Sequence, residues 1–188
     1  MSDTTVPLGP PYDARAVANL LLSAMEARRL TASNLPLQKL LYFAHGIMLT
    51  RHGVPLVDGY FEAWEYGPVH PLIYATFKAY GSGPITLPAR RRDLRTGMET
   101  AFPAPVDDRV DAIIDQVVSH LGRQRPTRLV HISHAVGGPW DYIANQTGTR
   151  AGYGLRISDT VIKDRFHRHM VAVGNEDRED VRDESPPA

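Results

Sequence analysis

Apolar residues recur at intervals of three and four positions along much of this chain, which is the spacing of helices that bury one face. The clearest stripe is made by five residues of one segment: Leu37, Leu40, Leu41, Ala44 and Met48. We expect helices in residues 13–29, 36–53, 70–80 and 107–121, a short one from Pro126, a helical turn at 141–145 and a last helix at 158–172. The pattern predicts a mainly α fold, a compact single-domain bundle of about six helices with at most a small β element.

Local signals support these boundaries. Asp13, Asp107 and Ser158 are residue types that cap helix N-termini, because a side-chain oxygen can accept from a first-turn amide. Pro36 suits a first turn, where its missing N–H needs no intrahelical partner. Gly53 suits a helix end, since glycine adopts the left-handed conformation without a Cβ penalty.

The remaining segments do not have a helical period. Residues 61–66 hold aromatic and apolar side chains without a helical period and are expected to be extended, with Gly67-Pro68 ending them. Residues 84–106 contain four prolines and are expected to form an irregular connection with one short hairpin. Residues 1–12 contain three prolines and are expected to form a flexible arm. Residues 173–188 are acidic and poor in apolar residues, which predicts a disordered tail.

The charge balance weakens the case for a nucleic-acid-binding protein. The 188 residues carry 21 basic and 21 acidic side chains, whereas a domain that neutralises phosphates needs an excess of Lys and Arg. The basic residues are nevertheless unevenly spread, because four arginines cluster in one connection: Arg90, Arg91, Arg92 and Arg95. A cluster of this kind is more often a solvated loop than a binding site.

Composition also limits the cellular compartment that we expect and the kinds of chemical site that the chain can form. The chain has no cysteine, which excludes disulfides, thiolate zinc sites and cysteine nucleophiles. No basic and apolar leader follows Met1, and no apolar run is long enough to cross a bilayer. We therefore expect a soluble, cytoplasmic protein without a membrane partner.

Catalytic patterns are weak. His131 and His134 are spaced to face one way on a helix, but no carboxylate nearby in the sequence completes a metal site. Glu62 and Glu65 would point to opposite faces of a strand, and Glu65 is better suited to cap the next helix. Ser133-His134 lacks the flanking glycines of a nucleophile elbow. We expect no enzyme, no cofactor and no bound metal.

Aromatic side chains are concentrated in residues 37–83, which hold most of the tyrosines and one of the two tryptophans. Such residues fill cores, but Tyr and Trp are also enriched where proteins bind each other. Trp64 and Tyr66 are beside the Gly67-Pro68 turn and are the better candidates for exposure. Leu37 and its neighbours Leu40, Leu41 and Phe43 are expected to hold the fold.

Several of these segments resemble a known family. The stretch LQKLLYFAHG from Leu37, the stretch FEAWEYGPV from Phe61, and the later LIY and FKAYG elements are similar to the Panacea domain, a family that includes SocA-like antitoxins. His134 followed by Pro139-Trp140 matches the family's later signature. The resemblance covers about residues 13–172, so we expect a Panacea-like helical domain there.

The resemblance implies an antitoxin that binds a cognate protein toxin and acts as an adaptor for the ClpXP protease. The partner-binding candidates are Trp64, Glu65, Tyr66, His70, Arg90, Arg91, Arg92, Arg95 and Trp140. One alternative is a nucleic-acid-binding autorepressor that uses the four arginines for phosphate contacts. A less favoured alternative is a hydrolase that uses Glu65 with His70 or His134.

Overall fold

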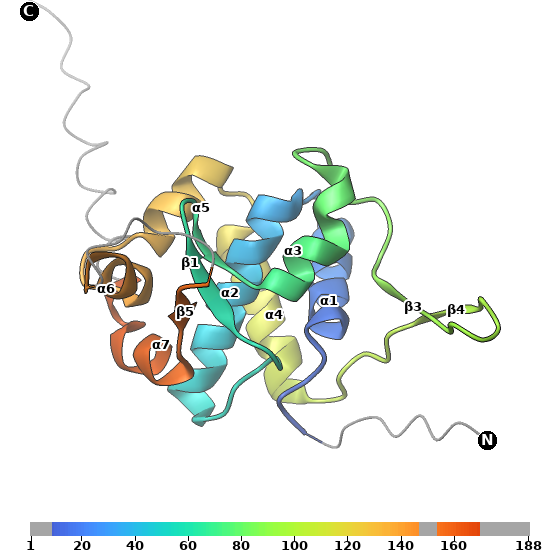
Figure 1. Cartoon of the computed structure of the whole chain (residues 1–188), viewed down its shortest axis with the longest axis horizontal. Helices are drawn as coiled ribbons and strands as arrows, with labels where there is room; N and C mark the ends of the chain where they lie inside the picture. Colours follow the sequence, from blue (N-terminus) through green and yellow to red (C-terminus); the bar gives the residue numbers. More distant parts are fainter. Residues whose placement is uncertain (1–8, 147–153, 170–188) are drawn as a thin grey trace, which may run out of the picture.

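A computed structural model describes residues 9–146 and 154–169 of the chain (Figure 1). The described residues form seven α-helices and two small sheets, which confirms the mainly α prediction with one helix more than expected. In chain order the α-helices are α1 (Ala14–Ala27), α2 (Asn34–His52), α3 (Pro71–Phe77), α4 (Asp108–Leu121), α5 (Pro126–Ser133), α6 (Pro139–Gln146) and α7 (Asp159–Arg165). A short 3-10 helix, η1 (Lys78–Tyr80), continues α3. None of the described helices is long and apolar enough to cross a membrane.

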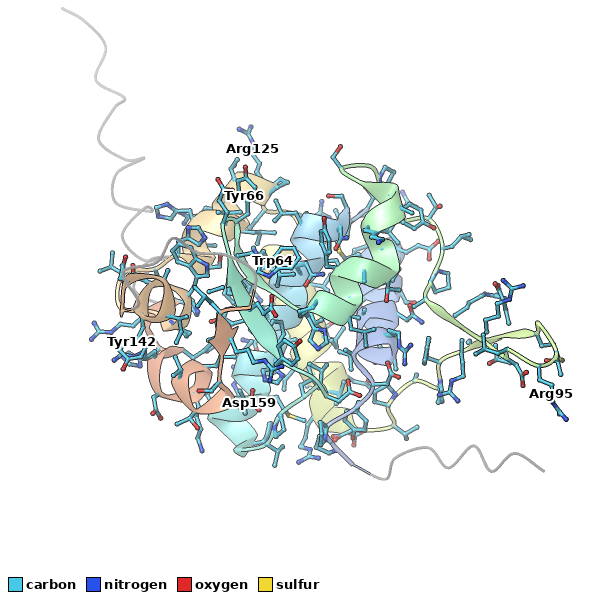
Figure 2. All side chains as sticks on the ribbon, in the orientation of Figure 1. Trp64, Tyr66, Arg95, Arg125, Tyr142 and Asp159 are labelled. Atoms are coloured by element: carbon cyan, nitrogen blue, oxygen red, sulfur yellow. The ribbon has the colours of Figure 1, made fainter. Side chains whose placement is uncertain are left out.

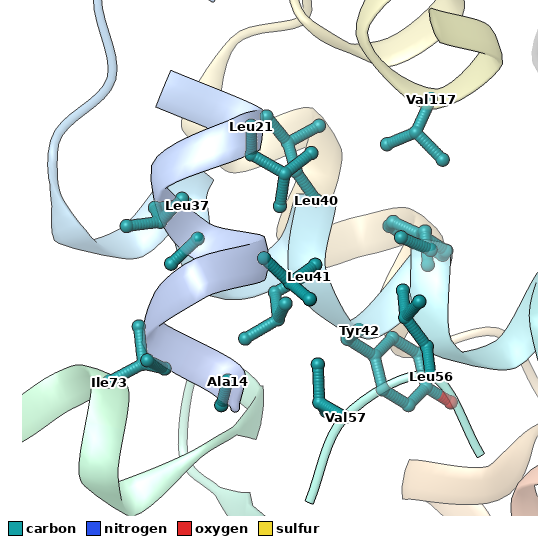
Figure 3. Packing of buried hydrophobic residues seen from close by; sticks show 14 of the residues in the cluster. Ala14, Leu21, Leu37, Leu40, Leu41, Tyr42, Leu56, Val57, Ile73 and Val117 are labelled. Carbon is teal, nitrogen blue, oxygen red and sulfur yellow. The ribbon is translucent and has the colours of Figure 1, made fainter. Parts of the chain in front are cut away.

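The long helix α2 runs through the middle of the domain. It contacts α1, α3, α4, α5, α7 and strand β2 (Gly67–Val69), so other elements cover it on nearly every side. Its predicted apolar stripe is buried, and so are four polar residues, Asn34, Gln38, Lys39 and His45. Figure 3 shows Leu40 and Leu41 packed between Leu21 of α1 and Val57. Fully burying each leucine stabilises the fold by about 1.5–3 kcal/mol.

The predicted helix boundaries are largely confirmed, because capping depends on residues close in sequence. The Asp13 carboxylate accepts from the Arg15 amide at 2.8 Å, and Asp107 caps α4 in the same way. Ser158 caps α7 by accepting from the Val161 amide. Gly53 ends α2 in the left-handed conformation, with φ of 73°.

The extended segment that the sequence predicts is strand β1 (Phe61–Trp64), at the centre of an antiparallel sheet in the order β2–β1–β5. Trp64 pairs with Gly67 of β2, and Phe61 pairs with Ile157 of β5 (Arg156–Ile157). The sequence analysis did not predict β5, since a two-residue strand has no period of its own. The three strands lie across one side of α2 (Figure 1).

The predicted hairpin in residues 84–106 is also present. Strands β3 (Arg90–Arg92) and β4 (Glu99–Ala101) pair antiparallel and project away from the helical body (Figure 1). The predicted last helix is interrupted: α7 ends at Arg165, residues 166–167 form a turn, and residues 168–169 are helical again, with Phe166 and His169 reaching the core. The predicted positions 170–172 lie outside the described residues.

His169 and Tyr42 form a buried polar contact. His169 Nδ1 lies 2.9 Å from the Ile132 carbonyl oxygen, which can only accept, so Nδ1 carries the proton. Nε2 therefore accepts from the Tyr42 hydroxyl at 3.0 Å. Burial lowers the pKa of His169 to about 4, which keeps the ring neutral and this arrangement intact near neutral pH.

Part of the segment that we assigned to the N-terminal arm is attached to the domain. Tyr12 is buried, and its backbone bonds to the Leu56 carbonyl oxygen and the Asp58 amide. Its hydroxyl donates to Asp107, so the start of the domain is linked to the cap of α4. Residues 1–8 and the predicted tail at 173–188 lie outside the described residues, and their flexibility stays a prediction.

Candidate partner-binding site

A groove of about 670 Å³ opens between the β1–β2 turn, the N-terminus of α2 and helices α3 and η1. Aromatic and apolar side chains share its lining with polar ones, of which Asn34 and Gln38 are buried at its base. The residues that line it are Ser33, Asn34, Leu35, Gln38, Trp64, Glu65, Tyr66, Val69, Tyr74, Lys78, Gly81, Ser82 and Pro126. Three of the predicted partner-binding residues, Trp64, Glu65 and Tyr66, therefore meet in one concave surface.

These three residues differ in how much they are exposed. Tyr66 stands at the tip of the turn with 61% of its surface exposed, and Glu65 beside it is also exposed. Figure 2 shows Tyr66 and Trp64 on the β1–β2 hairpin. Trp64 is half-buried, since it lies deeper along the strand. The turn presents one exposed aromatic side chain, Tyr66, beside one that is already packed, Trp64.

The packing of Trp64 fixes the orientation of its ring. The indole Nε1 donates to the Glu62 carboxylate at 2.7 Å, and the Tyr74 ring meets it edge-to-face at 4.8 Å between centroids. The Trp64 carbonyl oxygen accepts from Nε1 of Trp140 at 2.7 Å. Trp140 in turn stacks on His134, with 3.6 Å between the ring centroids. Because its neighbours hold it, Trp64 loses little rotamer freedom when a partner binds.

A chain of buried hydrogen bonds supports the base of the groove. Asn34 Nδ2 donates to the Tyr74 carbonyl oxygen at 3.2 Å, and Gln38 Nε2 donates to Asn34 Oδ1. Gln38 Oε1 accepts from the His70 amide at 2.8 Å. Asn34 and Gln38 were not predicted from the sequence as site residues, although both lie at helical spacing with Tyr42 and His45. Polar residues at this spacing on an otherwise apolar helix are the signal that could have found them.

The structure does not support His70 as a surface contact. Its side chain is 2% exposed, and its Nε2 donates to the Asp58 carbonyl oxygen at 2.8 Å. Burial lowers its pKa and favours the neutral ring. The expected capping role of Glu65 is also wrong, because α3 begins at Pro71 with His70 as its N-cap. His70 lies inside the domain, where its hydrogen bond to Asp58 joins the start of α3 to the loop before β1.

Trp140 and the arginines are separate from the groove. Trp140 is half-buried behind the β1–β2 turn, where it supports Trp64 instead of lining the groove. Arg90, Arg91 and Arg92 form β3, and Figure 2 shows Arg95 on the opposite side of the molecule from Tyr66. The predicted site residues therefore form two surfaces, not one.

The turn beside Trp64 is packed onto a buried lysine. Lys39 of α2 is fully buried, and its Nζ donates to the Pro68 carbonyl oxygen at 2.9 Å. Among the described residues no carboxylate lies within salt-bridge distance of this ammonium. Burial consequently lowers the pKa of Lys39 to about 7. Gly67 has φ of +95°, and a Cβ there would overlap Ser133 Oγ and lie 2.9 Å from Lys39 Nζ.

The geometry does not assemble the hydrolase alternative. Glu65 lines the groove, whereas His70 is buried on Asp58 and His134 lies under Trp140. Burial and the nearby Lys39 charge lower the pKa of His134 to about 4, below the range that suits a general base near neutral pH. Within residues 9–146 and 154–169, no three His, Asp or Glu side chains are placed to hold a metal ion.

Comparison with known proteins adds the family. Residues 37–141, which run from α2 to the start of α6, match the family described as Antitoxin SocA-like, Panacea domain. The chain is also 49% identical over 177 residues to the protein named Antitoxin SocA of Caulobacter vibrioides (strain NA1000 / CB15N), an alignment that covers 94% of each chain. The chain belongs to the SocA-like Panacea family. No solved structure matches it.

The family assignment confirms the resemblance seen in the two sequence stretches. The matched region contains most of α2, the β1–β2 hairpin, α3 and Trp140, and so it includes the groove except for the lining residues at 33–35. The Panacea match also includes the β3–β4 hairpin.

Gly67 gives a test of how tightly the Panacea turn is packed. We expect Gly67→Ala to lower the free energy of unfolding by about 2–4 kcal/mol, since it combines a left-handed backbone with steric overlap. Gly97→Ala is the matched control, because Gly97 has φ of +72° but open space around it. Its cost is expected to be about 1–2 kcal/mol from backbone strain alone. Denaturant unfolding measures both, and equal losses would contradict the packing of Gly67 on Ser133.

Lys39 gives a prediction about pH. The unfolded chain keeps the Lys39 proton up to a pKa of about 10.4, whereas the folded protein releases it at about 7. Since the unfolded state binds more protons between these values, this group makes the free energy of unfolding rise with pH, by up to about 1.4 kcal/mol per unit. Lys39→Met is expected to remove that rise from unfolding curves recorded across this range. The exposed Lys78→Met is the control, and parallel profiles for all three proteins would contradict the prediction.

Proposed function

We propose that this chain is an antitoxin that neutralises a cognate protein toxin by binding it through the groove beside Trp64. Membership of the SocA-like Panacea family supports the antitoxin function. The match to the curated relative spans nearly all of both chains, so it includes the groove as well as the helices that support it. The observation that carries the choice of surface is the exposed, aromatic-lined groove itself.

The groove has the properties of a binding centre. Its volume of about 670 Å³ is large enough to take several side chains of a partner segment. Trp64 and Tyr74 hold each other in place, and Tyr66 offers a large apolar ring with a polar tip. Tyr and Trp residues of this kind dominate the energies of protein–protein contacts. Rigid support from α2 lowers the entropy lost on binding, which favours affinity.

A stable complex requires more surface than the groove. Specific interfaces bury at least about 1,000 Å² in total, so we infer that the contact continues over the neighbouring face of α3. Leu72 and Tyr74 on that helix are 41% and 39% exposed. These side chains form an apolar margin beside the groove, and Lys78 and Glu65 give it polar edges.

We further propose that the chain is an adaptor that presents its bound toxin to the ClpXP protease. Its likeness to the SocA-like branch supports this step, since it implies an antitoxin that promotes toxin proteolysis. An adaptor must hold the toxin firmly and still leave another part of its surface for the protease. A groove confined to one side of the domain meets that requirement.

The groove predicts the effect of Tyr66→Ala on toxin binding. We expect the dissociation constant of the complex with the neighbouring gene's product to rise at least about tenfold, which is ~1.4 kcal/mol. Tyr66 is exposed at the tip of the turn, so the fold and its unfolding midpoint should stay unchanged. Tyr60→Ala is the matched control, since Tyr60 is also exposed but lies outside the groove. Isothermal titration calorimetry measures both variants.

The two negative results have different meanings. Equal binding by the wild type and both variants would place the toxin elsewhere on the domain. Failure of the wild-type chain to bind or co-purify with the neighbouring gene's product would overturn the antitoxin proposal itself.

The adaptor step predicts that degradation depends on this chain. In a reconstituted assay with ClpXP and ATP, we expect the toxin to be degraded only when the wild-type chain is present. Tyr66→Ala should slow degradation at limiting concentration and approach the wild-type rate at saturation, because only toxin binding is weakened. Toxin that is degraded equally without the chain, or that stays intact with it, would contradict the adaptor step.

A further inference from the structure

The β3–β4 hairpin is a surface that the groove does not account for. All six strand residues are exposed, and the hairpin projects from the body of the domain (Figure 1). Arg95 lies at its outer end (Figure 2). An isolated two-stranded hairpin is only marginally stable in water. Contacts at the base and the tip of this hairpin must therefore stabilise it.

The base of the hairpin is attached to α1. The Asn19 side chain makes two hydrogen bonds to the backbone of Ala89, accepting from its amide at 2.7 Å and donating to its carbonyl oxygen at 3.0 Å. Phe102, at the other side of the base, is buried. The guanidinium carbons of Arg15 and Arg91 lie 4.2 and 5.5 Å from the centroid of its ring. Cation–π contacts and burial therefore fix both strands where they leave the domain.

The tip of the hairpin is closed by Asp93. Its carboxylate accepts from the amides of Arg95 and Thr96, at 2.8 and 2.9 Å. Its own amide donates to the Met98 carbonyl oxygen, and its carbonyl oxygen accepts from the Gly97 amide. These bonds occupy the Asp93 carboxylate within the turn and hold its pKa below the ordinary value. The hairpin thus keeps a defined shape although its strands bury nothing.

The exposed side chains of this hairpin have a specific chemistry. Arg90 and Arg92 are two residues apart in a strand, so they share one face, while Arg91 turns to Phe102 on the other. Within the described residues, no carboxylate forms an ion pair with Arg90, Arg92 or Arg95. Leu94 at the tip is 98% exposed and Met98 is 64% exposed. The result is a basic ribbon with an apolar end.

Protection against aggregation explains only part of this pattern. Arginines along an exposed strand edge do prevent pairing with another copy of the chain. They do not explain why a fixed turn holds Leu94 fully in solvent. A nucleic-acid contact fits less well than a protein contact, because the chain as a whole has no excess of Lys and Arg and a phosphate backbone offers nothing to the exposed apolar side chain of Leu94. A partner with acidic side chains around an apolar spot matches both the arginines and the tip.

We propose that the β3–β4 hairpin is a second contact for the toxin, and that it takes an acidic surface on that protein. This inference rests on the proposed antitoxin function. Exposed charges at the margin of an interface act chiefly on association, since they attract the partner before contact is made. The hairpin accordingly sets the association rate, while the groove sets the dissociation rate.

Charge reversal at three positions tests this division. The test variant is Arg90→Glu/Arg92→Glu/Arg95→Glu, which leaves Arg91 and the base untouched. The matched control is Arg51→Glu/Lys163→Glu/Arg168→Glu, which changes the net charge equally at exposed sites of α2, α7 and the segment after α7. A third variant, Arg90→Lys/Arg92→Lys/Arg95→Lys, keeps the charge. Association and dissociation rates are measured on immobilised purified toxin at about 50 mM and about 500 mM NaCl.

We expect the charge-reversed hairpin to lower the association rate constant at low salt by about tenfold or more, with the dissociation rate changed by less than about threefold. Its salt dependence should largely disappear, because the attractive charges are gone. The control triple variant should change the association rate by less than about threefold, and the lysine variant should retain most of the wild-type rate. Unfolding curves confirm that each variant is folded.

Each contrary result has a definite meaning. If the hairpin and control variants lower the association rate constant equally, the effect comes from net charge alone and the proposal is overturned. Duplex DNA binding by the wild type that the hairpin variant loses, with unchanged toxin kinetics, would assign the hairpin to nucleic acid and overturn it as well. If Tyr66→Ala speeds dissociation while charge reversal has no effect, the antitoxin function holds and the hairpin inference fails. If the wild-type chain does not bind the toxin, both proposals fail.

Discussion

Because other elements surround most of α2, each buried polar side chain on that helix must find a partner inside the protein. Asn34, Gln38, Tyr42 and His45 follow one another at helical spacing, and each bonds to a different segment: α3, the backbone before it, the segment after α7 and α7 itself. The same helix therefore fills the core with its apolar residues and sets the positions of its neighbours with its polar ones. Loss of one of these bonds would leave a buried group unsatisfied, at a cost of about 1–3 kcal/mol.

This constraint explains why a groove persists at the end of α2. The Asn34–Gln38 chain holds α3, and the Lys39–Pro68 bond holds the β1–β2 hairpin. Helix α3 and the β1–β2 hairpin are each attached to α2. They do not contact each other along their full length, so a groove remains between them. Trp64 and Tyr74 both line that groove, and their edge-to-face contact fixes the positions of the two rings. A binding surface made in this way is already formed before a partner arrives.

Features set by neighbouring residues could be predicted from the sequence, and features set by distant contacts could not. The caps at Asp13, Asp107 and Ser158 depend on amides two or three residues away. The position of His70 depends on Gln38, which accepts from its amide from 32 residues away, and on the Asp58 carbonyl oxygen, and such distant contacts cannot be inferred from the sequence. Trp64, Glu65 and Tyr66 could be linked to a site because they are adjacent in sequence. That the predicted partner-binding residues belong to two surfaces, the groove and the β3–β4 hairpin, could be seen only from the three-dimensional structure.

The two surfaces also have independent supports. The groove depends on α2 and its polar contacts, whereas the hairpin depends on Asn19 and Arg15 of α1 and on Phe102 at its own base. No described hydrogen bond or ring contact joins Tyr66 to Arg95, and Figure 2 shows them on opposite sides of the domain. Changes at sites without shared partners usually add in free energy. A domain built in this way can vary the charges that attract a partner without altering the groove that retains it.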